Sequence, residues 1–208
     1  MTDPSRLWLF VIASVALTVT PGPNVLYIVT RGIGQGRRAA VTSALGVDSA
    51  LLIHVAASAM GVSAIVASSA TAFTTIRWIG AIYLLGLGVQ AWRSDGLSVT
   101  RPVLPARHRH LFRQGFVVSL LNVKVALFFL AFLPQFVDPE AAMPALQILC
   151  LGLWFDLVGT LVNIVIALVA AGTAARLRHV AWLGRAARWL AATAMGGLAL
   201  QLAFSGRR

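Results

Sequence analysis

Long apolar runs alternate with short polar or basic segments along most of this chain. The charge-poor runs extend over Leu7 to Thr30, Ala39 to Val66, Ala72 to Trp92, Gln114 to Phe136, Pro144 to Gly172 and Ala187 to Phe204. A helix needs about 20 apolar residues to cross the hydrocarbon core of a bilayer, and all but the short last run satisfy this. The pattern predicts an all-α integral membrane protein with six transmembrane helices.

Composition supports a membrane protein and excludes several other classes. Hydrophobic residues make up 59% of the 208 residues, charged residues only 11%, and the mean hydropathy is +0.85. The net charge of +11 comes from arginines between apolar runs, not along one amphipathic face, so we expect no nucleic-acid partner. The single cysteine, Cys150, excludes an intramolecular disulfide or a cysteine metal cluster. The first run has no Ala-x-Ala type cleavage site, so we expect a retained helix instead of a signal peptide.

Basic residues outside the runs predict the orientation in the membrane. The first, third and fifth loops carry twelve arginines, whereas the opposite side carries four and an acidic loop with Asp138 and Glu140. Basic loops stay on the cytoplasmic side. The count therefore places the odd-numbered loops in the cytoplasm and both termini outside, which is the periplasm of a bacterium.

The basic third loop divides one transmembrane transporter domain, residues 1–208, into halves of about 1–93 and 114–208, joined by a cytoplasmic loop at 94–113. Three helices per half means that a repeated half lies inverted in the membrane. Both halves have a polar interruption in the first helix, Thr20 to Asn24 and Ser119 to Lys124. Each is followed by a long second helix with one carboxylate, Asp48 and then Asp156. These features favour a transporter built from two inverted halves.

The first interruption is the sequence Thr20-Pro21-Gly22-Pro23-Asn24. Prolines lack an N–H, so Pro21 and Pro23 should leave the carbonyls of the residues four positions earlier, Leu17 and Val19, without helical partners. Such groups are tolerated at membrane depth only when they are buried in protein or line a cavity, as in many transporter substrate sites. A kink that only shapes the helix is the alternative. We interpret the break as one wall of a substrate site.

Charged and amide side chains also fall near the middle of the predicted membrane. At about 1.5 Å per residue, Asn122, Lys124, Asp48 and Asp156 all lie roughly 13 to 18 Å deep. Lys124 is the only lysine. An intramembrane lysine costs about 2.5 to 3.5 kcal/mol, so it should face the interior and have a partner, for which the two aspartates are available. The pairing either ties helices together or belongs to a site in which Lys124 binds the carboxylate of a zwitterion and an aspartate meets its ammonium.

Helical spacing gives further detail on two runs. Asp156, Thr160 and Asn163 stand at i, i+4 and i+7, so they share one face, which should point inward. His54 lies six residues after Asp48, about 120° away around the helix, so the two do not stack. His54 either titrates during a proton-coupled cycle or packs with a satisfied ring.

Several of these segments resemble the lysine exporter family, LysE/RhtB, of amino-acid efflux proteins. The resemblance rests on Thr20 to Asn24, Gly36-Arg37, Gly46, His54, Trp78 to Gly88 and Leu121 to Phe136. It implies a six-helix bundle in the bacterial inner membrane that exports amino acids by coupling to the proton gradient. The motif positions carried over are Thr20, Pro21, Gly22, Pro23, Asn24, Asn122 and Lys124. Val123 replaces a proline that is usual in the family, so a softer break is expected in the fourth helix.

We therefore expect a secondary exporter of neutral amino acids of the threonine, homoserine or leucine kind, with protons as the second solute and possible dimerisation. A cation exporter or ion channel with ligands Asp48, His54 and Asp156 is the alternative, although Lys124 would repel a cation. A membrane enzyme lacks a plausible nucleophile and base. No Gly-x-x-x-x-Gly-Lys loop is present, so ATP is not the direct energy source. No cofactor and no metal are expected.

Overall fold

The structure is a computed structural model that describes residues 4–68, 105–137 and 143–173, and twelve single positions at 71, 74, 75, 78, 79, 82, 85, 86, 89, 93, 189 and 193. Its elements are α1 (Pro4–Val19), α2 (Pro23–Gln35), α3 (Arg37–Ser68), α5 (His108–Leu120), α6 (Val123–Leu127), the π-helix η1 (Phe128–Phe132), the 3₁₀-helix η2 (Leu133–Phe136) and α7 (Pro144–Thr173). The predicted helices at 72–92 and 187–204 lie outside the continuous segments.

Two of these helices, α3 and α7, are long and apolar enough to cross a membrane by themselves. The pairs α1–α2 and α5 with Val123–Phe136 qualify when each is counted as one broken span, with bends of 54° and 48°. The described segments thus contain two to four candidate spans and confirm an all-helical membrane protein. Four of the six predicted runs have a counterpart, and α7 matches its run to within one residue.

The start of the fourth run was predicted too late. We expected the helix to begin near Gln114, but α5 begins at His108 and includes Arg109 and Arg113. We had placed the start of this helix directly after its last arginine, Arg113, where the charge-poor run begins. A helix, however, continues past the apolar zone when its basic side chains are exposed, as these are. Part of the predicted loop at 94–113 is therefore helical.

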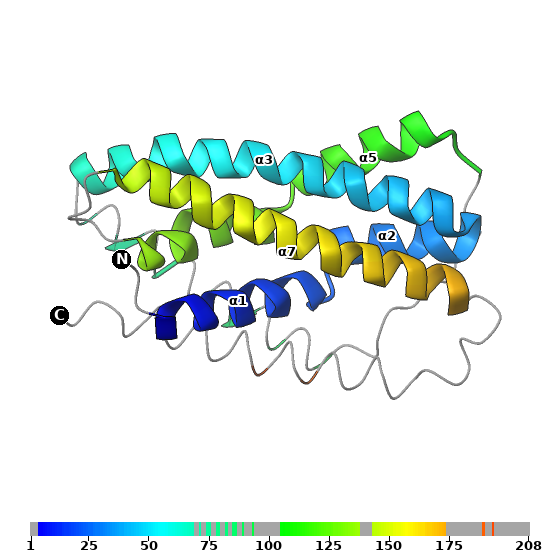
Figure 1. The fold of residues 1–208 in the computed structure, drawn as a ribbon, viewed down its shortest axis with the longest axis horizontal. Coiled ribbons are helices and arrows are strands. Elements are labelled where there is room, and N and C mark those ends of the chain that lie inside the picture. The colour runs from blue at the N-terminus through cyan, green and yellow to red at the C-terminus, as the bar shows by residue number, and fades with distance from the viewer. Residues whose placement is uncertain are drawn as a thin grey trace.

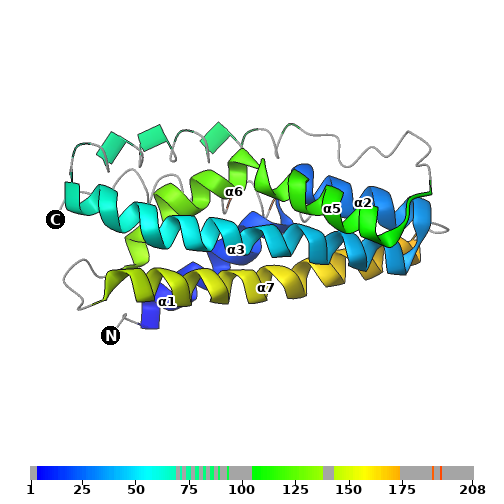
Figure 2. The same ribbon diagram turned by 90° about the horizontal axis from the view of Figure 1, so that it is seen from above.

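Helices α3 and α7 lie side by side along the length of the molecule, and α1 and α2 follow one another along α7 (Figure 1). On the other side of α3, α5 and α6 follow one another in the same way (Figure 2). Each broken helix therefore packs against an unbroken one. This arrangement holds both breaks near the middle of the bundle.

Glycines allow α3 to approach its neighbours closely. A Cβ on Gly46 of α3 would overlap the α5 backbone, and one on Gly115 of α5 would lie 2.6 Å from the Ser43 carbonyl oxygen. On the opposite side, a Cβ on Gly152 of α7 would lie 2.7 Å from Val55. Real Cβ atoms essentially never approach this closely. Alanine at any of these positions would push the helices apart.

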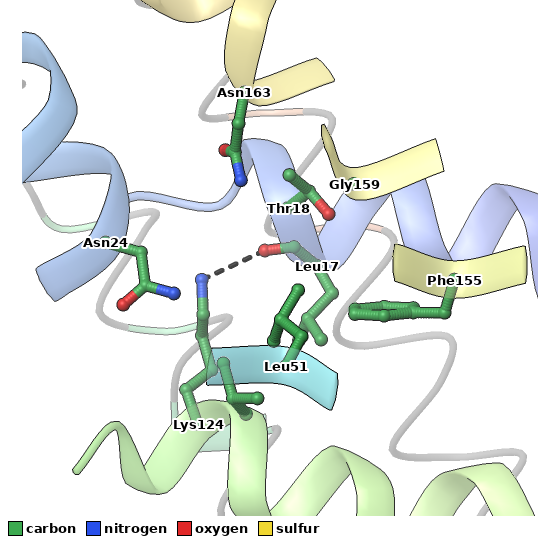
Figure 3. A pocket seen from close by; sticks show the side chains of 9 residues that line it. Leu17, Thr18, Asn24, Leu51, Lys124, Phe155, Gly159 and Asn163 are labelled. Carbon is green, nitrogen blue, oxygen red and sulfur yellow. Dashed lines mark hydrogen bonds between the residues drawn. The ribbon is translucent and has the colours of Figure 1, made fainter. Parts of the chain in front are cut away.

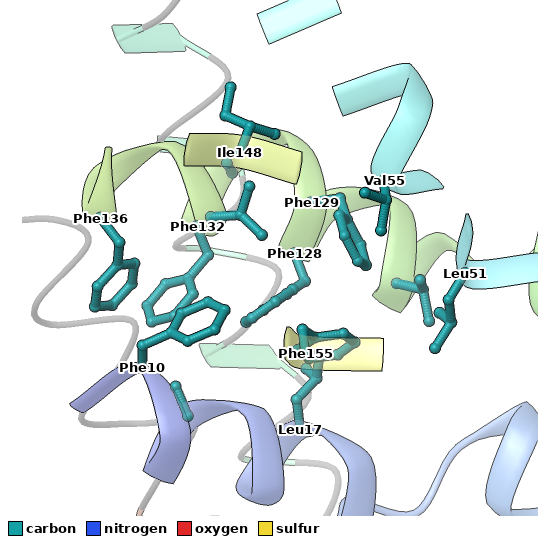
Figure 4. Packing of buried hydrophobic residues seen from close by; sticks show 14 of the residues in the cluster. Phe10, Leu17, Leu51, Val55, Phe128, Phe129, Phe132, Phe136, Ile148 and Phe155 are labelled. Atoms are coloured by element: carbon teal, nitrogen blue, oxygen red, sulfur yellow. The ribbon is translucent and has the colours of Figure 1, made fainter. Parts of the chain in front are cut away.

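Six phenylalanine rings form an aromatic cluster between α1, α7 and the η1–η2 segment (Figure 4). The cluster rings are Phe10, Phe128, Phe129, Phe132, Phe136 and Phe155. Phe128 is fully buried at the centre, with ring centroids 4.7 Å from Phe155 and 5.0 Å from Phe132. Such pairs contribute about 0.5–1.5 kcal/mol beyond their buried area. The cluster fixes the π-helix against α1 and α7.

The polar end of the bundle brings two predicted loops together. The Gln35 side chain accepts a hydrogen bond from the Ala106 amide at 3.2 Å, and the Thr42 hydroxyl lies 3.1 Å from His108 Nδ1. The first and third loops therefore lie at the same end of the molecule. This agrees with the sequence prediction that both arginine-bearing loops are on one side of the membrane.

Candidate functional site

The predicted break in the first span is present. Helix α1 ends at Val19 and α2 begins at Pro23, which occupies its first turn, where a missing N–H is tolerated. Gly22 between them is fully extended, with φ −169° and ψ −178°. The Thr20 amide and hydroxyl both donate to the Ala16 carbonyl, at 3.0 Å and 2.6 Å. Helix α1 therefore ends at the point in the sequence where Pro21 and Pro23 predicted an interruption.

Lys124 binds the end of this broken helix. Its ammonium donates to the carbonyl oxygens of Leu17 at 2.9 Å and Thr20 at 3.0 Å, and the residue is only 4% exposed. The Leu17 carbonyl is one that Pro21 was predicted to free. The expected pairing of Lys124 with an aspartate was wrong, because the carboxyl end of α1 presents unpaired carbonyls and the negative end of the helix dipole.

The second break lies at Leu121 and Asn122, between α5 and α6. The Asn122 side chain caps α6 by accepting a hydrogen bond from the Lys124 backbone amide at 3.0 Å. Asparagine is among the preferred N-cap residues because its oxygen satisfies a free amide of the first turn. The valine at 123 therefore does not remove the break, which bends the span by 48°.

Buried amides connect the two breaks directly. Asn122 donates to the Asn24 side-chain oxygen at 2.8 Å, and the Asn24 amide donates to the Ser119 hydroxyl at 3.1 Å. His54 Nε2 lies 3.3 Å from the Ser119 carbonyl, and the His54 ring stacks on Phe129. All three members of the Asn24–Asn122–Ser119 chain are buried. His54 is linked to its end and does not line the cavity described next.

A cavity of about 20 Å³ lies where the lysine, the first break and α7 meet (Figure 3). Its lining consists of Leu17, Thr18, Asn24, Leu51, Lys124, Val125, Phe155, Gly159 and Asn163. The Lys124 ammonium enters from one wall and Asn163 faces it from the opposite wall, whereas Leu17, Leu51 and Phe155 are apolar (Figure 3). This volume holds about one water molecule, so a larger solute fits only after the surrounding helices move.

A second polar cluster lies behind Asn163. The Asn163 amide donates to Asp48 Oδ1 at 2.7 Å, and both residues are only 4% exposed. Thr160 faces the same carboxylate, and Asp156 is close enough to interact with it electrostatically. The predicted shared face of Asp156, Thr160 and Asn163 is thus present and points to Asp48. Among the described residues, no group of three or more His, Cys, Asp and Glu side chains could hold a metal ion.

The predicted site residues fall into three groups. Two of them, Asn24 and Lys124, line the cavity. The residues that form the two breaks beside it are Thr20, Pro21, Gly22, Pro23 and Asn122, and the residues that do not line it are Asp48, Asp156 and His54. Sequence reasoning missed the apolar wall of Leu17, Leu51 and Phe155, which carries no chemical signal. It also did not include Asn163 in the site, although Asn163 shares a face with Asp156.

The family profile for LysE type translocators matches residues 15–206 of this chain. An uncharacterized membrane protein of Vibrio cholerae is 34% identical over 64% of this chain and 66% of its own length. A homoserine/homoserine lactone efflux protein of Salmonella typhimurium is 33% identical over 69% of each chain. A leucine efflux protein of Salmonella choleraesuis is 30% identical over 64% of each chain. No solved structure matches.

Proposed function

Because the chain belongs to the LysE type translocator family, we propose that it exports neutral amino acids from the cytoplasm in exchange for protons. Family membership makes it a membrane translocator and not an enzyme. The names of its relatives point to homoserine and leucine as candidate substrates. Both are zwitterions without a charged side chain.

The observation that carries this proposal is the position of the Lys124 ammonium. It is fixed by two carbonyls of the broken helix and stands at the cavity. An ammonium has three donors, so one remains for a solute. A substrate carboxylate is the natural acceptor, because charge-assisted hydrogen bonds are about twice as strong as neutral ones. Asn24 also lines the cavity, and one of the two N–H groups of its amide is left after the hydrogen bond to Ser119.

The remaining walls suit an uncharged side chain. Leu17, Leu51, Val125 and Phe155 are apolar and belong to, or border, the aromatic cluster. A charged substrate side chain would lose its hydration there without gaining a partner. An aliphatic side chain gains about 25 cal/mol for each Å² that it buries. These walls favour leucine-like or homoserine-like substrates over lysine.

We propose the same orientation in the bacterial inner membrane as the arginine count predicts, with the Gln35–Ala106 end in the cytoplasm and both termini in the periplasm.

We also propose that residues 1–93 and 114–208 are inverted halves. In support, each half has a broken first helix, bent by 54° and 48°, followed by a long helix that carries an aspartate.

The test is efflux from proteoliposomes loaded with all twenty amino acids and homoserine, under an imposed pH gradient, with the external medium analysed by mass spectrometry. Release of one or a few neutral amino acids, faster with the gradient than without it, is expected. Liposomes with the Lys124→Met variant should release them at least about 30-fold more slowly. Release of inorganic cations without any amino acid would instead support the cation exporter.

A further inference from the structure

We propose that Asp48 and Asp156 together hold one exchangeable proton, in a site separate from the Lys124 cavity. Its role in exchange depends on the proposed function, but the site itself can be tested without transport. Four observations on the described residues support it: unbalanced charge, unsatisfied oxygens, too few ligands for a metal ion, and a direct link to the cavity.

The two carboxylates act on each other electrostatically, and no cation in the described part of the chain pairs with them. Asp48 is buried within the bundle and interacts electrostatically with Asp156 on the neighbouring helix. Neither forms an ion pair with any described residue, since the lysine that was expected to pair with them binds carbonyls instead. Two adjacent negative charges are strongly unfavourable away from water. One bound positive charge removes most of that penalty.

Around these two aspartates there are more buried hydrogen-bond acceptors than donors. Three buried oxygens, Asp48 Oδ2, Asp156 Oδ1 and Asn163 Oδ1, have no partner in the described part of the chain. An ionised carboxylate only accepts hydrogen bonds, whereas a protonated one donates as well. A single proton on either aspartate supplies one donor, which pairs two of the three oxygens when the carboxylates share it. Buried polar atoms are rarely left unpaired, so the two aspartate oxygens point to a missing hydrogen.

A sodium ion fits the same place less well. Sodium sites in transporters draw on backbone carbonyls of unwound helices. Here Asp48 and Asp156 lie on α3 and α7, which are continuous through this region, so their carbonyls are used within the helices. The carbonyls at the first break are occupied by Lys124. The side chains alone offer few oxygens, whereas a proton needs only one or two.

Asn163 links this site to the cavity. Its amide donates to Asp48, and its side chain lines the cavity opposite Lys124. A substrate whose carboxylate meets Lys124 would bring its ammonium toward Asn163 and hence toward the carboxylates. The ammonium and the proton then compete for the same negative charge. Such competition is reciprocal, so each solute weakens the binding of the other, as exchange requires.

Other ionisable groups on the packed helices face elsewhere. Lys124 is across the cavity, and His54 faces Phe129 and Ser119. On α2, Tyr27 donates to the Leu111 carbonyl and Arg31 donates to Gln114. The exposed groups are Arg37 and Arg38 of α3, His108, Arg109, His110 and Arg113 of α5, and Cys150 of α7. The aspartate pair is thus the titrating unit that faces Asn163.

The experiment is infrared spectroscopy of substrate-free protein in nanodiscs, in potassium buffer, as the pH is raised through neutrality. The wild type should show the carbonyl band of a protonated carboxylic acid, and this band should disappear at higher pH. The Asp48→Asn/Asp156→Asn double variant should lack the band. The matched control is Asp138→Asn, in the predicted acidic loop, which should retain it. Size-exclusion profiles and tryptophan fluorescence verify that each variant is folded.

Three outcomes would overturn the proposal: no titrating band in the wild type, a band that persists in the double variant, or a band abolished by sodium at constant pH, which would make this a sodium site.

A second experiment measures proton flux with a pH-sensitive dye in proteoliposomes. The single variant Asp48→Asn should move substrate down its gradient with proton flux at background, and undiminished proton flux would exclude Asp48 from coupling. Because the infrared arm needs no substrate, failure of the exporter proposal remains distinguishable.

Discussion

Replacing Lys124 by methionine separates the structural role of the lysine from its role in binding. Methionine has a similar length and no charge. The change removes both hydrogen bonds to the Leu17 and Thr20 carbonyls, which lie at the end of α1. It also removes a positive charge from a residue that is only 4% exposed. The two effects on stability have opposite signs.

Each buried carbonyl left without a partner costs about 1–3 kcal/mol, so the two together cost about 2–6 kcal/mol. Removing an intramembrane lysine recovers about 2.5–3.5 kcal/mol. The net effect on folding should lie between about 1.5 kcal/mol of stabilisation and about 3.5 kcal/mol of destabilisation. Losing the charged partner of a buried substrate carboxylate costs about 2–5 kcal/mol, which lowers transport by about 30-fold to about 5,000-fold.

Initial efflux rates in proteoliposomes measure transport, and unfolding followed by the fluorescence of the six tryptophans measures stability. Lys124→Arg is the matched control: it keeps the charge, so it should fold and retain more export than the methionine variant. Normal export by a stably folded Lys124→Met variant would refute the carboxylate-binding role. A loss of stability far beyond about 3.5 kcal/mol would show that the lysine serves mainly to hold the helix end.

Three other variants test the break and the aromatic cluster. Gly22→Ala should leave folding nearly unchanged but weaken substrate affinity, because the alanine Cβ would lie 3.2 Å from the Lys124 ammonium. The control is Gly61→Ala, which has open space around it and should change neither folding nor substrate affinity. Pro21→Ala with Pro23→Ala should restore an amide partner to α1 and impair turnover, measured as the maximal efflux rate. Phe128→Ala should destabilise the protein by about 3–5 kcal/mol in thermal unfolding, as expected for a fully buried ring.

Each of these has an outcome that contradicts it. Unchanged affinity in Gly22→Ala would mean that the ammonium does not contact substrate. Unchanged turnover in the double proline variant would reduce the break to a kink without function. The exposed Phe112 of α5 is the control for the aromatic cluster, and equal destabilisation by Phe112→Ala would show that burial of Phe128 is not the cause.

The sequence predicts the first break correctly because its cause is local. Pro21 lacks an N–H wherever it stands, so the freed Leu17 carbonyl follows from covalent chemistry. The common face of Asp156, Thr160 and Asn163 is likewise a consequence of helical spacing. Four of the apolar runs have matching helices or broken helices for the same reason. These features depend on residues within one or two turns of each other.

The partner of Lys124 could not be predicted in this way, because it depends on how the helices pack against one another. Sequence spacing gives the depth of a residue in a helix, but packing decides which neighbour it faces. Asp48, Asp156 and the helix end are all at similar depth, and backbone carbonyls are invisible in a search for charged partners. The π-helix at Phe128–Phe132 is similar, since no residue type requires it. It forms where the aromatic cluster holds the rings.

The glycine contacts between α3 and α5 have a mechanical consequence. Gly46 and Gly115 bring the two backbones into direct contact near Ser43, with no side chain between them to change rotamer. Two surfaces matched this closely resist sliding, so α3 and α5 should travel as one rigid body whenever the cavity enlarges. The flexing has to occur at residues outside this contact. The interruptions in the described helices are Leu121–Asn122 after α5, Gly36 before α3, and Thr20–Gly22 between α1 and α2. Spin labels placed on α3 and α5 should therefore keep a constant separation through the transport cycle, while labels on α1 and α2 change theirs.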